Sequence, residues 1–415
     1  MPLFPDKPLV ILGASVRSLA ESAGRDGWAV YAADLFCDLD LQLIARDVVA
    51  LANGAGGDAA GYPWSIRTAA AGFPASAPWC YTGAIENHPN LIDAIARERP
   101  LAGNAGDVVR QLRDPVQVAA AACAAGLSFP ETLPSPDGVP LDGTWLVKPL
   151  AGAGGRGIRR WTPTIAADQA MQQDTAASRL HVWQRFTTGT PLSAAYCMSA
   201  GATRLVGVSR QLIGEPWCHA GGFAWCGAVA LPPPESRPTV DQLVTPLERL
   251  GRILAERFRP VGMIGVDLIV DAAGRVTVIE VNPRPTASME LFERSGAGSI
   301  AGSHLAACGF SAPSDIPLEQ SPPRPTSTWA KAVLFAAQPT PVSQSLLDAL
   351  SRETTPWTQA DGDWPALADI PRPGQIIAAG APVVSIFAVT PTAEDALATL
   401  RDRVARIDAL LTATP

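Results

Sequence analysis

The chain has 415 residues, 47% of them hydrophobic, and a formal net charge of −7; this length predicts about two or three domains. The acidic balance, without any Lys/Arg-rich run, argues against a nucleic-acid partner, and no stretch approaches the roughly 20 apolar residues that cross a membrane. Seven scattered cysteines favour reduced thiols in a cytoplasmic protein over a disulfide framework.

The first predicted elements are a strand, a helix and a second strand over residues 7–34. Such a βαβ unit implies a parallel sheet with ligands at the carboxyl ends of its strands. Only Gly13 of the dinucleotide-binding glycine pattern is present, so a dehydrogenase is weakly supported and a nucleotide-free Rossmann-like domain is at least as well supported. Gly13, Ala14, Ser15 and Arg17 are weak candidates for substrate contacts.

The rest of the chain alternates between helix and strand patterns. A helix is predicted over 114–126, because Pro115 stands in its first turn and Gly126 at its end. An amphipathic helix is predicted over 239–258 and a last helix over 392–411. The remaining predictions, in chain order, are strands with a glycine-rich turn over 144–161, a strand over 181–186, several strands over 193–231, a hairpin over 261–282, a Pro/Ser-rich linker over 311–328, and strands near 329–336 and 383–389.

The hairpin gathers polar side chains on one face. With a four-residue turn at 271–274, Val270 pairs with Arg275 and Asp267 lies opposite Val278. Glu280 is then the diagonal neighbour of Asp267, about 7–8 Å away, and Asn282 follows on the same face. Two carboxylates and an amide oxygen suit Mg²⁺. The alternative is a solvated strand face, and a one-residue change of register would turn Asp267 away.

A glycine-rich turn, "KPLAGAGGRGIRR", lies between two strands and contains Gly152, Gly154, Gly155 and Gly157. Its backbone N–H groups could close over phosphate oxygens, and Lys148 just before it could add a point charge. A flexible surface turn is the alternative. Lysine is rare in this chain, where only Lys7, Lys148 and Lys331 occur, so each lysine is more informative than usual.

Together these motifs resemble the ATP-grasp superfamily. The resemblance rests on the lysine and glycine turn, on "VWQRFTTG", and on the hairpin "GVDLIV…VIEVNPRPTASME" with its E-x-N-x-R signature. It implies a mixed α/β and α+β ATP-grasp fold. The implied parts are a Rossmann-like domain at 1–105, an ATP-grasp domain at 106–310 with its glycine loop at 151–157 and its metal hairpin at 261–284, a linker at 311–328 and a C-terminal α/β, β-rich extension at 329–415.

The resemblance also implies roles for individual residues. The cofactors would be ATP and Mg²⁺ or Mn²⁺. The metal ligands would be Asp267, Glu280 and Asn282; Arg284 and Lys148 would act on the reacting phosphate; Lys148, Gly154, Gly155 and Gly157 would contact phosphates; and Gln184, Arg185 and Phe186 would form the hinge that reads adenine.

Two features depart from the family pattern. The lysine that many members carry at the start of the lobe helix is missing from "RQLRDPVQ", where Pro115 stands in its place and Arg113 is the candidate substitute. No acidic residue follows the hinge in "TTGTPLS" to hold the ribose.

The implied activity is an ATP-dependent ligase that forms an acyl phosphate from a small-molecule carboxylate and couples it to an amine. "GASVRSLAESAGRDGWAVYAADLF" and "NPRPTAS" are similar to predicted carboligases related to biotin carboxylase, which are associated with tetrahydromethanopterin- and methylofuran-linked one-carbon metabolism. The alternatives are a carboxylase that activates bicarbonate as carboxyphosphate and a non-catalytic ATP-binding scaffold. The oligomeric state stays open, with a homodimer among the alternatives.

Overall fold

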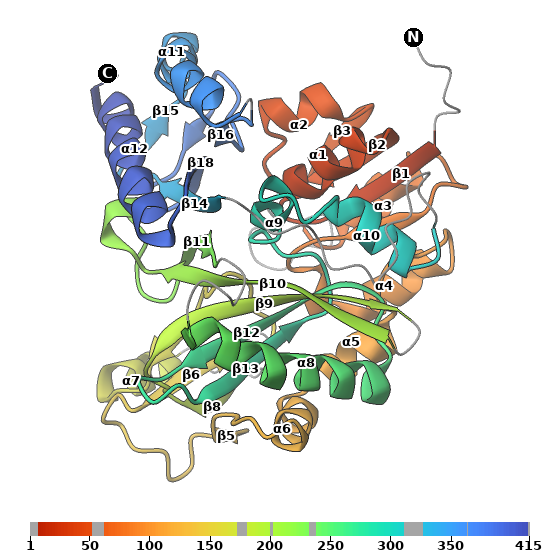
Figure 1. Cartoon of the computed structure of the whole chain (residues 1–415), viewed down its shortest axis with the longest axis vertical. Coiled ribbons are helices and arrows are strands. Elements are labelled where there is room, and N and C mark those ends of the chain that lie inside the picture. Colours follow the sequence, from red (N-terminus) through yellow and green to blue (C-terminus); the bar gives the residue numbers. More distant parts are fainter. Residues whose placement is uncertain are drawn as a thin grey trace.

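The computed structural model describes residues 7–51, 62–171, 181–199, 202–231, 238–310, 327–362 and 364–413. It has the mixed α/β architecture predicted from the sequence, with three main sheets (Figure 1). Among these residues, no helix is both long and apolar enough to cross a bilayer. All seven cysteines are free thiols.

The N-terminal part is a parallel sheet of four strands in the order β3-β2-β1-β4. Its strands are β1 (Lys7–Leu12), β2 (Trp28–Asp34), β3 (Asp47–Ala50) and β4 (Trp79–Tyr81). The helices of this part and the next connection are α1 (Arg17–Arg25), α2 (Leu39–Ile44), α3 (Ser65–Ala71), the 3-10 turn η1 (Ile85–Asn87), α4 (Pro89–Ala96) and α5 (Gly106–Leu112). Residues 9–12 of β1 are fully buried because apolar side chains cover both faces of the sheet. The predicted βαβ opening is confirmed.

A larger, antiparallel sheet runs through the middle of the molecule (Figure 1). Its order is β13-β12-β9-β10-β11-β14-β18-β16. The strands are β9 (Thr190–Ser199), β10 (Ala202–Ile213), β11 (Trp225–Ala230), β12 (Gly262–Val270), β13 (Val276–Asn282), β14 (Thr328–Phe335), β16 (Leu367–Ala368) and β18 (Pro382–Thr390). The helices α6 (Pro115–Ala124) and α8 (Pro238–Phe258) bury their apolar side chains against β9, β12 and β13. The predicted helices and the predicted hairpin are therefore present.

A small lobe carries the glycine loop. Its sheet has the order β5-β8-β6-β7, formed by β5 (Thr132–Leu133), β6 (Trp145–Pro149), β7 (Arg159–Arg160) and β8 (His181–Arg185), with α7 (Pro163–Met171) beside them. Trp145, Trp161 and Trp183 form most of its core. The glycine loop joins β6 to β7, as the sequence predicts.

The C-terminal part continues the large sheet, because β14, β16 and β18 pair in line with β11. The last elements are η3 (Pro216–Cys218) beside this region, α9 (Glu290–Arg294), α10 (Ile300–Ala307), β15 (Thr340–Pro341), α11 (Gln344–Ala360), β17 (Ile376–Ile377) and α12 (Ala393–Ala413). Sequence patterns missed α11, although Ser343 caps it by accepting a hydrogen bond from the backbone N–H of Leu346. Of the linker predicted over 311–328, residues 311–326 lie outside the described residues, and Thr328 begins β14. We propose the division of the chain into the four segments 1–105, 106–310, 311–328 and 329–415.

Candidate functional site

A cavity of about 540 Å³ lies where the large sheet, the small lobe and the N-terminal sheet meet. Residues from all of these parts line it, among them Ser15, Lys148, Asp267, Glu280 and Arg284. The fold therefore brings together side chains that are more than 200 positions apart in the chain.

The hairpin places Asp267 directly opposite Glu280, which differs from the predicted register. Val270 pairs with Val276, and Leu268 with Val278, so the register is one residue away from prediction. Ile279 is then an extra residue, and the pairing resumes with Asp267 opposite Glu280. A change of register by one residue alone would have turned Asp267 and Glu280 to opposite faces of the hairpin. The β-bulge brings them back to the same face.

The bulge also corrects which valines share the polar face. Regular alternation along β13 would place the side chains of Val276 and Val278 on the face of Glu280, but they lie in the core that includes α6 and α8. Ile279, Glu280 and Asn282 line the cavity instead. The bulge therefore removes the two valines from the face of Glu280 and places Ile279 there.

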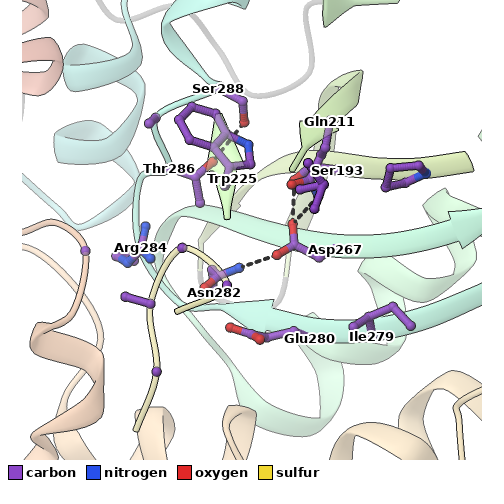
Figure 2. A pocket seen from close by; sticks show the side chains of 18 of the residues that line it. Ser193, Gln211, Trp225, Asp267, Ile279, Glu280, Asn282, Arg284, Thr286 and Ser288 are labelled. Carbon is purple, nitrogen blue, oxygen red and sulfur yellow. Dashed lines mark hydrogen bonds between the residues drawn. The ribbon is translucent and has the colours of Figure 1, made fainter. Parts of the chain in front are cut away.

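Asp267 is held by three donors (Figure 2). Ser193 Oγ and Gln211 Nε2 donate to its Oδ1 over 2.9 and 3.0 Å, and Asn282 Nδ2 donates to its Oδ2 over 3.1 Å. Burial, followed by the nearby Glu280 charge, raises the pKa of Asp267 to about 6. Sequence reasoning missed Ser193 and Gln211, because β9 and β10 reach Asp267 only through sheet pairing.

Glu280 is surrounded by positive charge. Arg113 Nη1 donates to its Oε1, and the side chain keeps 32% of its surface accessible because it faces the cavity. Burial would raise the pKa of Glu280, but Arg113 and then Lys148 hold it below its usual range. Glu280 is thus an anionic carboxylate at neutral pH.

Lys148 projects from β6 toward the same carboxylates. Its Nζ donates to Gln184 Oε1 over 3.1 Å. Burial lowers the pKa of Lys148, while the Glu280 charge opposes that shift. Lys148 and Gln184 were predicted in different roles, yet they contact each other, and the Gln184 side chain also donates to Thr132 Oγ1 over 3.1 Å.

Only part of the predicted adenine hinge, residues 184–186, lines the cavity. Phe186 lines it, whereas Arg185 lies half-exposed against Glu131. The backbone N–H groups of Arg185 and Phe186 already donate to the carbonyls of Glu131 and Thr144 over 2.8 and 2.9 Å. These two amides are therefore engaged within the lobe.

The glycine loop closes one side of the cavity. Gly152, Gly154 and Gly155 line it, whereas Gly157 lines a neighbouring hollow. At Gly155 (φ +77°) a Cβ atom would lie 1.8 Å from the carbonyl oxygen of Phe223. Only glycine allows this close approach of two backbones.

Arg284 follows the end of β13 and faces the cavity, as the resemblance implies. Its Nε and Nη2 both lie 2.7 Å from Oε1 of the buried Glu86, and its Nη1 donates to the carbonyl of Pro285 over 3.1 Å. A carboxylate from the N-terminal part therefore orients the guanidinium, and no sequence pattern indicated Glu86.

The far end of the cavity contains a buried ion network. Arg17 Nη2 donates to Glu290 Oε2 over 3.1 Å, and its Nε donates to Asp369 over 2.8 Å. Lys331, on β14, donates to Glu290. Of the four weak candidates near the N-terminus, Ala14, Ser15 and Arg17 line the cavity, and the rarity of lysine was the signal for Lys331. Gly13 does not line it; a Cβ atom there would lie 2.0 Å from Thr82 Oγ1, so Gly13 serves packing.

The central segment of the chain matches a known protein family. Residues 113–288 match the family described as ATP-grasp domain. This segment is an ATP-grasp domain. A search of curated proteins finds no match.

Solved structures share the fold over nearly the whole chain. The L-amino acid ligase of Bacillus licheniformis superposes with a TM-score of 0.67 at 17% identity, over 96% of this chain and 97% of its own. Carboxyaminoimidazole ribonucleotide synthase of Aspergillus clavatus, solved with ATP, gives 0.68 at 15% identity, over 97% and 99%. The biotin carboxylase domain of the Hydrogenobacter thermophilus 2-oxoglutarate carboxylase, solved with MgADP, ADP and bicarbonate, gives 0.66 at 12% identity, over 95% and 89%. At these identities the likeness shows the ATP-grasp fold.

The ATP-grasp domain supplies the polar hairpin, Lys148 and the glycine loop. Ser15, Arg17 and Lys331 line the cavity from outside that domain, and Glu86, also outside it, contacts Arg284. The hairpin fits a divalent cation by its donor atoms. Asn282 turns its Nδ2 to Asp267, which leaves Oδ1 as an acceptor, and Glu280 has one oxygen without an Arg113 contact. Among the described residues no three His, Cys, Asp or Glu side chains form a metal cluster, and the third donor here is an amide.

Proposed function

We propose that the protein is an ATP- and Mg²⁺-dependent carboxylate–amine ligase. One observation carries the proposal: Asp267 and Glu280 face each other beside Asn282, in a cavity that also holds Lys148 and the glycine loop. The same cavity extends to Ser15 and Arg17, beyond the carboxyl end of β1, where ligands bind in such sheets. It therefore has room for a nucleotide and a second reactant.

The proposed metal ligands are Asp267, Glu280 and Asn282, and Mg²⁺ or Mn²⁺ suits their oxygens. A cation there would neutralise charge on the β- and γ-phosphates during transfer. Ser193 and Gln211 hold Asp267 in place, so the carboxylate needs no rearrangement to face the cavity.

The proposed reaction has two steps. A substrate carboxylate oxygen attacks the γ-phosphorus of ATP and ADP leaves; an amine nitrogen then attacks the acyl carbon, phosphate leaves and the amine loses a proton. Lys148 and Arg284 would stabilise the transferring phosphoryl group by fixed positive charge. The glycine loop would exclude water that otherwise hydrolyses the acyl phosphate. No protein nucleophile is needed, because the substrate carboxylate is the nucleophile.

The test is ADP release with Mg²⁺ and a panel of carboxylates and amines, run in parallel with labelled bicarbonate. The proposal expects ADP only when a carboxylate and an amine are both present. ADP release that depends on bicarbonate and on no amine identifies a carboxylase instead. ATP binding without ADP under any mixture identifies a scaffold.

We propose further that the substrates belong to one-carbon cofactor metabolism, with glutamate-type ligation in methanopterin or methylofuran biosynthesis. The support is the N-terminal and "NPRPTAS" motifs, so the panel includes glutamate with pterin and furan precursors. We also propose a cytoplasmic location, and light scattering on the purified protein tests a homodimer.

A further inference from the structure

Arg113 covers the carboxylate that the proposed metal site needs. It follows α5, and its Nη1 donates to Glu280 Oε1. Its other terminal nitrogen, Nη2, donates to Asn87 Oδ1 over 3.1 Å and approaches the carbonyl of Leu150 at 3.5 Å. The Arg113 side chain is only 15% exposed and lines the cavity, so it forms part of the cavity wall.

The same contacts reach the glycine loop. Asn87, which accepts from Arg113, donates through Nδ2 to the carbonyl of Gly152 over 3.2 Å. Leu150 immediately precedes that loop and Gly152 lies near its start. Arg113 therefore links the Glu280 carboxylate to the segment that would close over phosphates.

The charges around Glu280 indicate what its contact with Arg113 does. Asp267 and Glu280 carry two negative charges, and Arg113 and Lys148 bring two positive charges beside them, while Arg284 is neutralised by Glu86. A divalent cation arriving alone would meet both fixed cations at close range, where repulsion is strong. Phosphate oxygens offer Arg113 and Lys148 other partners, and the guanidinium fork suits them.

We propose that Arg113 caps Glu280 in the free protein and transfers to nucleotide phosphates, so that the divalent cation binds tightly only together with the nucleotide. This inference rests on the proposed function. Arg113 acts here as a positioning residue, since it controls access to Glu280 and touches no reacting atom in the free protein.

The experiment measures Mn²⁺ binding by electron paramagnetic resonance on the whole chain, with and without a non-hydrolysable ATP analogue. In the unaltered protein the analogue should tighten Mn²⁺ binding, by about 5- to 150-fold if the coupling is of ordinary size. Arg113→Met should bind Mn²⁺ alone more tightly than the unaltered protein does, and should bind the analogue more weakly in calorimetry. A merely structural role for Arg113 could only weaken Mn²⁺ binding.

Arg110→Met is the matched control, because Arg110 lies one turn earlier and pairs with Asp93 outside the cavity. It should change neither affinity. Arg113→Lys keeps one charge and should restore part of the nucleotide affinity. Equal Mn²⁺ affinity with and without the analogue, or no tighter binding in Arg113→Met, overturns the inference. If the unaltered protein binds neither Mn²⁺ nor the analogue, the proposed function fails with it; if both bind independently, only the inference fails.

Discussion

Asp267 and Glu280 are cross-strand neighbours on β12 and β13, and the extra residue Ile279 makes them so. The bulge lets the same hairpin bury Val278 in the core that includes α6 and α8 and present Glu280 to the cavity. Two carboxylates are thereby held side by side in the cavity, and Arg113, Lys148 and Arg284 bring positive charge close to Glu280.

Replacing Glu280 by Gln should lower the rate of ADP formation by at least about 100-fold. A neutral amide lacks the negative charge that would hold the divalent cation beside the phosphates. A coupled ADP assay measures this, and circular dichroism should show an intact fold. Glu248→Gln, on the exposed side of α8, is the matched control and should leave the rate unchanged. Retained activity of the Glu280 variant at saturating Mg²⁺ would remove Glu280 from the site.

Adding a methyl group to the glycine loop should matter more at Gly155 than at Gly154. Both residues have positive φ, so both substitutions strain the backbone by about 1 kcal/mol. Only at Gly155 does the new Cβ meet the Phe223 carbonyl, whereas at Gly154 it meets nothing within 4 Å.

We therefore expect Gly155→Ala to lower kcat/KM for ATP by about 100-fold, since a misplacement of about 1 Å has that effect, and Gly154→Ala to lower it far less. Steady-state kinetics on the two variants give the comparison. Equal losses would mean that strain alone, and not the contact with Phe223, sets the position of the loop.

Removing Arg284 should destabilise the protein as well as inactivate it. Arg284→Met leaves the buried Glu86 carboxylate without its guanidinium, a change that costs about 3 kcal/mol or more. The double variant with Glu86→Gln removes the stranded charge and should recover much of that loss, yet it should stay inactive. Urea unfolding and ADP formation are measured on the three variants. Two single losses that simply add in the double variant would show that the residues are not coupled.

Stability should fall in mild acid because of His304. This buried ring accepts from the N–H of Met263 at Nδ1 and contacts the Ala102 carbonyl through Nε2, both over 3.0 Å, and burial lowers its pKa to about 4. The unfolded chain protonates this histidine near pH 6.5, so between about pH 6.5 and 4 the unfolded state binds more protons and stability decreases as pH falls.

At pH 5 this contribution amounts to about 2 kcal/mol. His304→Gln keeps a donor and an acceptor but cannot titrate. The variant should be less stable at pH 7 yet lose less stability between pH 7 and 5 than the unaltered protein does. Chemical unfolding at the two pH values measures the difference, and parallel pH profiles would rule His304 out as the cause.

The sequence alone was sufficient to predict the local features of the candidate site. Period-2 alternation places Glu280 and Asn282 on one face, and glycine spacing marks the loop after Lys148, because each pattern lies within one short segment where backbone geometry is repetitive. The hairpin turn is equally local, so Asp267 could be assigned to the facing strand. The ATP-grasp fold was implied by the resemblance of these motifs to the superfamily, and not by their periodicity or spacing.

Only the tertiary structure decided how these features meet. The bulge at Ile279, the Arg113 contact with Glu280 across 167 positions and the Glu86 contact with Arg284 across 198 positions depend on the packing of separate parts. Lys331 and Arg17 likewise meet at Glu290 from opposite ends of the chain. Long-range ion pairs follow no sequence period, because they form only where folded elements bring the charges together and exclude water.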